Sequence, residues 1–98
     1  METKTMNLTI SAWVAEYTID CWPNDIGTDP PEVVKSTKTT RTVAITDRRQ
    51  LQEFHDQADQ QVDMYLTQGC YDSSERAECA KWKRAYAKLA TMLKEWPV

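Results

Sequence analysis

The chain has 98 residues, of which 41% are hydrophobic and 28% charged, and its formal net charge is −3. These proportions are typical of a globular protein, and the length predicts one small domain over residues 1–98 with a thin hydrophobic core. The balance of 12 basic and 15 acidic residues excludes a generally basic nucleic-acid-binding surface, and it is too mild for a dense DNA mimic.

The start of the chain and the cysteines indicate the compartment. Residues 1–6 (METKTM) lack the apolar stretch of a secretory signal, and no window approaches the roughly 18 continuous apolar residues of a membrane span. We therefore expect a soluble cytoplasmic protein with a flexible tail at residues 1–5. An odd number of cysteines argues against a disulfide framework, so mostly buried free thiols are expected at Cys21, Cys70 and Cys79, with a Cys70–Cys79 disulfide left open.

Residues 6–22 (MNLTISAWVAEYTIDCW) are rich in β-branched and aromatic types and predict a strand. The apolar side of its alternation changes midway, from Leu8 and Ile10 to Trp13, Tyr17 and Ile19. Because a shift of one residue turns every side chain to the other face, we expect a bulge or bend between residues 12 and 15. Trp13 is expected to face the core. Residues 23–31 are dense in Pro, Asn, Asp and Gly and predict a loop.

Residues 32–46 (EVVKSTKTTRTVAIT) contain no glycine or proline and predict a single long second strand. The two strands would form an antiparallel β-hairpin over residues 6–46. An isolated two-stranded ribbon is marginal in water, so the hairpin must pack on helices or pair with another chain.

From residue 47 onward the apolar residues recur at steps of three and four, which predicts two amphipathic helices. Asp47 and Gln50 fit a capping box before the first helix, and Gly69 fits its end. Asp72 and Glu75 fit a second capping box. The expected stripes are Leu51, Phe54, Ala58, Val62, Tyr65 and Leu66, then Cys79, Trp82, Tyr86, Leu89, Leu93 and Trp96. The predicted fold class is α+β, a β-hairpin followed by an antiparallel helical hairpin over residues 47–96 (ββαα).

Motifs for catalysis or cofactor binding are missing from the sequence. No glycine-rich phosphate loop is present, and no Cys or His pair completes a metal site around His55 and Asp59, so we expect no cofactor and no metal. Asp56, Asp59 and Asp63 are one turn apart on an exposed face of the first helix, where nothing would raise a pKa. We therefore expect a protein that is not an enzyme.

Two segments are candidates for binding a partner protein. Trp22 opens the polar loop and is interpreted either as a lid on the core or as an aromatic anchor. The first helix carries an acidic face that suits a basic groove of a partner, unless it simply pairs with the basic second helix. The candidate partner-binding residues are Trp22, Asn24, Asp25, Ile26, Asp29, Glu53, Asp56, Asp59 and Asp63.

Two alternatives stay open. The second helix presents Lys81, Arg84 and Lys88, which favour a nucleic-acid or transcription accessory protein, although the interleaved Trp82 and Tyr86 fit the core better than a stacking platform. The other alternative is a homodimer that pairs through the edge of the β-hairpin.

In size, lack of catalytic motifs and ββαα layout, the chain resembles small accessory proteins of temperate bacteriophages, including anti-defence and host-takeover inhibitors. The resemblance implies stoichiometric binding to a host protein or protein complex in the host cytoplasm and blocking of its activity.

Overall fold

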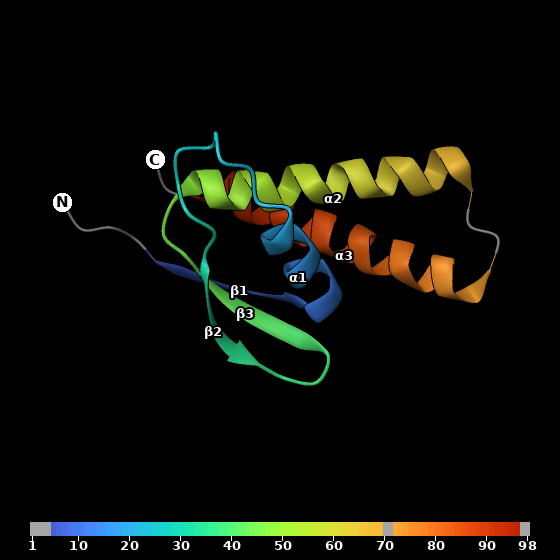
Figure 1. The fold of residues 1–98 in the computed structure, drawn as a ribbon, viewed down its shortest axis with the longest axis horizontal. Coiled ribbons are helices and arrows are strands. Elements are labelled where there is room, and N and C mark those ends of the chain that lie inside the picture. Colours follow the sequence, from blue (N-terminus) through green and yellow to red (C-terminus); the bar gives the residue numbers. More distant parts are fainter. Residues whose placement is uncertain (1–4, 70–71, 97–98) are drawn as a thin grey trace.

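The computed structural model describes residues 5–69 and 72–96, and it shows three helices beside a three-stranded antiparallel sheet (Figure 1). The protein is therefore of the α+β class, as predicted, but the ββαα order is wrong. The elements are β1 (Met6–Ser11), α1 (Ala12–Asp20), β2 (Glu32–Ser36), β3 (Thr40–Ile45), α2 (Arg48–Gln68) and α3 (Ser73–Glu95).

The segment expected to form one irregular strand is instead a strand followed directly by a helix. β1 ends at Ser11 and α1 begins at Ala12, within the stretch where a bulge was expected. Val14, Ala15 and Thr18 are buried, which is helical spacing, whereas Trp13 is 44% exposed. The change of face therefore marks a change from strand to helix, and the expectation that Trp13 faces the core was wrong.

The expected second strand is two strands joined by a tight turn. The Thr37 hydroxyl accepts from the Thr40 amide at 3.0 Å and lies 2.6 Å from the Thr40 hydroxyl, so a threonine closes a turn that contains neither glycine nor proline. β2 and β3 form this hairpin, and β1 pairs with the other edge of β3 in the antiparallel sense. The sheet order is β1-β3-β2, which leaves β1 and β2 as edge strands.

The two long helices confirm the predicted helical hairpin. Asp47 and Gln50 form the capping box of α2, and Asp72 accepts from the Glu75 amide at the start of α3. Gly69 ends α2 with a φ of +88°, a conformation that favours glycine. The Tyr65 hydroxyl donates to Glu78 at 2.8 Å and joins the helices towards their connected ends.

The core lies where the helices cover the inner face of the sheet. It contains Leu8 and Ile10 of β1 and Val43 and Ile45 of β3, and the helices contribute Val14, Leu51, Phe54, Ala58, Trp82, Ala85, Leu89 and Met92. The predicted stripes match near the sheet but not at every position, since Leu66 is 66% exposed and Tyr86 is also exposed. The connected ends of α2 and α3 extend beyond the sheet (Figure 1), so the last turns of α2 lie beside α3 rather than over the sheet.

Candidate functional site

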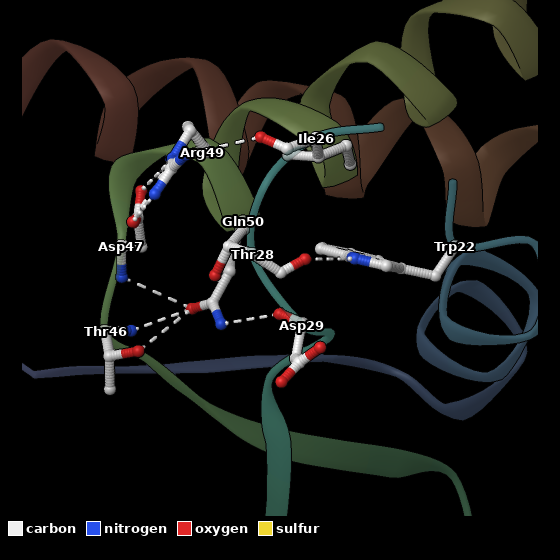
Figure 2. Close-up of polar contacts among 8 residues, drawn as sticks. All are labelled: Trp22, Ile26, Thr28, Asp29, Thr46, Asp47, Arg49 and Gln50. Atoms are coloured by element: carbon white, nitrogen blue, oxygen red, sulfur yellow. Dashed lines mark hydrogen bonds and ion pairs between the residues drawn. The ribbon is translucent and has the colours of Figure 1, made fainter. Parts of the chain in front are cut away.

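Residues 21–31 form a loop, which includes the predicted loop at 23–31 and also Cys21 and Trp22, and the loop folds back against the first turns of α2 (Figure 2). The Trp22 ring packs on Phe54 with 6.0 Å between ring centroids, and its indole N–H donates to the Thr28 carbonyl at 3.0 Å. Trp22 is half-buried against the core. The side chain of Trp22 therefore covers the edge of the core, which is the first of its two predicted roles. Its second predicted role, as an anchor for a partner protein, stays a prediction.

Gln50 ties this loop to the start of α2. Its side chain is buried, its Nε2 donates to the Asp29 carbonyl at 2.9 Å, and its Oε1 accepts from the Thr46 amide at 2.9 Å and the Asp47 amide at 3.3 Å (Figure 2). One amide side chain thus satisfies backbone groups of the loop and of the strand-to-helix junction. The sequence indicated the capping role of Gln50. No local pattern indicated its hydrogen bond to Asp29, which lies 21 positions earlier in the chain.

Arg49 makes a second connection between the loop and α2. Its guanidinium forms an ion pair with Asp47 at 2.7 Å and donates to the Ile26 carbonyl at 3.3 Å. The hydrogen bonds from Arg49 hold the pKa of the Asp47 carboxyl below its usual range. Gly27 has a φ of +87°, and a Cβ there would lie 2.7 Å from the Arg49 guanidinium, so glycine fits both the turn and this contact.

The docked loop brings together two predicted partner-binding segments. One pocket of about 170 Å³ lies between the loop and α2, and it is lined by Ile26, Arg49, Gln52, Glu53 and Asp56. Burial raises the pKa of Glu53, and the negative charges of Asp56 and Asp25 raise it further. We call Asp25, Ile26, Glu53, Asp56, Asp59 and Asp63 the acidic surface; its last two members are exposed further along α2.

Asn24 and Asp29 lie beside this surface rather than in its pocket. Both are exposed, and both line an open hollow of about 630 Å³ within the loop, together with Trp22. Asp29 contributes its backbone carbonyl to the Gln50 hydrogen bond, while Asn24 makes no hydrogen bond with any residue the structure describes.

No close ion pair between described residues joins the acidic face of α2 to the basic face of α3. Within residues 5–69 and 72–96, the ion pairs are Arg41–Glu16 and Arg49–Asp47, and His55 contacts Asp56 at 3.3 Å. None of these contacts joins α2 to α3. The alternative in which the two charged faces pair across the helical hairpin is therefore not what the described residues show. Both faces remain available to solvent or to a ligand.

The three basic residues of the nucleic-acid alternative converge on a different site. Lys81, Arg84 and Lys88 line a pocket of about 200 Å³ between α3 and the outer edge of β1. Thr9, Ile10, Ser11, Thr40 and Ala85 complete its lining, and we call this site the basic pocket. Trp82 is buried in the core, and Tyr86 packs on His55 with 4.9 Å between ring centroids. Neither aromatic side chain lines the basic pocket.

The remaining candidates among the described residues are His55, Cys21 and Cys79. His55 lies beside Asp56 at 3.3 Å, and in the described part of the chain no three His, Cys, Asp or Glu side chains group as metal ligands. Cys79 is buried as expected, but Cys21 is exposed, which corrects its predicted burial. Cys70 and residues 1–4 of the predicted tail lie outside the described residues.

No protein-family model, no curated protein and no solved structure matches this chain. None of the helices described here combines the length and the apolar character needed to cross a membrane. The fold alone therefore defines the class of this protein. It is an α+β protein, and its described residues form three helices and a three-stranded antiparallel sheet.

Proposed function

We propose that this protein is a non-enzymatic binding module whose acidic surface receives a basic segment of a partner protein. The observation that carries the proposal is the pocket between the loop and α2, which Ile26, Glu53 and Asp56 line together with Arg49, whose charge is paired with Asp47 outside the pocket. A lysine or arginine of the partner would place its aliphatic stem on Ile26 and its charge beside the two carboxylates.

The electrostatics of Glu53 favour such a partner. Its Oε2 atom is buried and accepts no hydrogen bond from a described residue, and the neighbouring Asp25 and Asp56 carry the same charge. In the protein without a bound partner, ionisation of the Glu53 carboxyl is therefore unfavourable. A cation of the partner would offset the repulsion, so part of the binding energy would come from relief of an unfavourable state of the free protein.

The consequence of binding would be inhibition of a host protein or protein complex. This step rests on the resemblance to phage accessory proteins and on a small surface that suits stoichiometric occlusion.

The test is quantitative affinity purification of the full chain from bacterial lysates, followed by mass spectrometry. We expect the unchanged protein to capture a partner at a stoichiometric ratio, and the double variant D56K/D59K to lose most of it. The matched control is D20K/E95K, which makes the same change of net charge at two exposed acids outside the acidic surface.

The control should retain the partner. Capture that is equal for all three proteins, or that fails equally in D56K/D59K and D20K/E95K, would show that the acidic surface does not direct binding. Absence of any stoichiometric partner across several bacterial hosts would reject the binding module itself.

Self-association through a sheet edge stays a second proposal, because β2 is an edge strand with every residue exposed. Val33 and Val34 are 41% and 52% exposed, whereas a register irregularity between Val33 and Lys35 interrupts the pairing pattern. Light scattering at high protein concentration separates the cases: twice the monomer mass supports the dimer, and the monomer mass rejects it.

A further inference from the structure

The basic pocket is unrelated to the acidic surface and shares no residue with it. It lies at the outer edge of β1, where the Lys88 Nζ donates to the Thr9 carbonyl at 2.5 Å. Lys81, Arg84 and Lys88 follow one another at spacings of three and four residues, so they project from one face of α3. Ile10 and Ala85 are buried and supply apolar lining.

The cations of this pocket have no carboxylate partner in the part of the chain that the structure describes. Among the described residues, neither Lys81, Arg84 nor Lys88 forms an ion pair, and the hydrogen bond to Thr9 leaves Lys88 two further N–H donors. Ser11, at the rim, precedes α1 without capping it, and its hydroxyl makes no hydrogen bond within the described residues. Three positive charges and a free hydroxyl therefore converge on one concave site in an acidic protein.

From this convergence we infer that the basic pocket binds the phosphate group of a small phosphate monoester. A monoester carries close to two negative charges at neutral pH and three acceptor oxygens, which match the three cations and the Ser11 hydroxyl. The volume of about 200 Å³ is below the roughly 300 Å³ of the smallest typical ligand cavities, so it suits the phosphate and its attachment point rather than a whole nucleotide.

The pocket favours a single phosphate over a nucleic-acid strand. Sequence-tolerant binding of single strands combines a basic groove with aromatic side chains on which the bases stack. No aromatic residue lines the basic pocket, and Trp82 beneath it is 1% exposed. A net charge of −3 also opposes a long polyanion more than it opposes a small ligand.

The test is an NMR titration of the full chain with inorganic phosphate and with glycerol phosphate at pH 7.5, with ionic strength held constant by potassium chloride. We expect saturable shifts of the backbone amides of Ile10, Ser11 and Ala85. Arg84→Gln and Lys81→Gln should each weaken binding roughly tenfold, the effect of losing one charge-assisted hydrogen bond. Binding should also weaken as the pH falls below about 6, where the monoester takes up a proton.

The matched control is Lys83→Gln, which removes the same charge from the same helix at a residue that does not line the pocket. It should change phosphate affinity less than about twofold if site geometry rather than net charge decides binding. Shifts that grow without saturation, or equal weakening by Lys83→Gln, would reduce the finding to an adventitious ion only and overturn the inference.

A twelve-nucleotide single strand of DNA forms the second arm of the titration. If this strand binds more tightly than glycerol phosphate and its binding depends steeply on salt, the inference of a monoester site is wrong and the nucleic-acid alternative is favoured. Circular dichroism of each variant confirms that the fold is kept, so that a loss of binding reports on the pocket.

Discussion

The acidic surface and the basic pocket are built in different ways. The acidic surface depends on an irregular loop that Gln50, Arg49 and the Trp22–Phe54 contact hold against α2. The basic pocket depends on regular elements, since one face of α3 lies over the edge of β1. A surface made by a docked loop should therefore fail when a single anchor is removed, whereas a surface spaced along one helix should tolerate the same damage.

The two regions also differ in how their charges are arranged. Burial raises the pKa of Glu53, and the negative charges of Asp56 and Asp25 raise it further, so ionisation of this carboxyl is unfavourable before any partner arrives. The cations of the basic pocket form no ion pair with a described residue and are distributed over two turns of α3. The small net charge of the chain thus conceals two surfaces of opposite sign.

The largest effect should come from Gln50→Ala, which removes an anchor of the loop and should therefore damage the acidic surface but not the basic pocket. The variant leaves the Thr46 and Asp47 amides and the Asp29 carbonyl without their partner, so we expect a loss of about 2 kcal/mol in the free energy of unfolding. Urea denaturation measures the loss. In the folded variant, NMR shifts should concentrate in residues 22–31 and leave the basic pocket unchanged.

The control for this change is Gln60→Ala, the same substitution at an exposed position of α2. It should alter stability by less than about 0.5 kcal/mol. Equal losses in the two variants would mean that Gln50 does not anchor the loop.

A smaller effect is expected from Asp47→Ala, which removes the N-terminal cap of α2 and the partner of Arg49. Loss of such a cap costs about 1 kcal/mol in the free energy of unfolding. Because the folded state lowers the pKa of Asp47, its stabilisation is present above the unfolded pKa and is lost as the pH falls through the folded pKa. The difference between the two proteins should therefore shrink in acid, and a difference that is independent of pH would contradict this account.

The smallest effect is expected from Glu53→Gln, which tests the unfavourable charge arrangement of the acidic surface. This substitution should stabilise the protein. Since the folded state raises the pKa of Glu53, the stability that its protonated form contributes is present at low pH and is lost as the pH rises through the folded pKa. The variant should therefore match the unchanged protein in acid and exceed it at neutral pH by under about 1 kcal/mol. Thermal unfolding at both pH values is the measurement, with Glu95→Gln as the control outside the acidic surface.

The helical half of the fold was predictable because local signals agree there. Asp47, Gln50 and Gly69 mark the ends of α2, and the apolar period runs between them. The strand half was not, because β-branched and aromatic residues occur in both states. The spacing of Val14, Ala15 and Thr18 indicates a helix in retrospect, and the Thr37 turn lacks the residues that normally mark one.

The sequence predicted the two parts of the candidate site, the polar loop and the acidic face of α2, but not that they form one surface. Composition indicated the polar loop, and helical periodicity indicated the acidic face of α2. Their contact depends on Gln50 reaching Asp29 and on Arg49 reaching Ile26, which are pairings between distant positions without a local pattern. Likewise, spacing placed Lys81, Arg84 and Lys88 on one face, while only the fold set the edge of β1 against them.

The central claim, that the acidic surface recruits the partner, is tested most directly by the salt dependence of association. The rate constant of complex formation with the captured partner would be measured from low to high ionic strength for the unchanged protein, for Asp56→Asn and for Arg84→Gln. We predict a rate that falls with salt, a shallower dependence for Asp56→Asn, and no such flattening for Arg84→Gln. A salt dependence that Asp56→Asn leaves unchanged, or that Arg84→Gln flattens instead, would contradict the account.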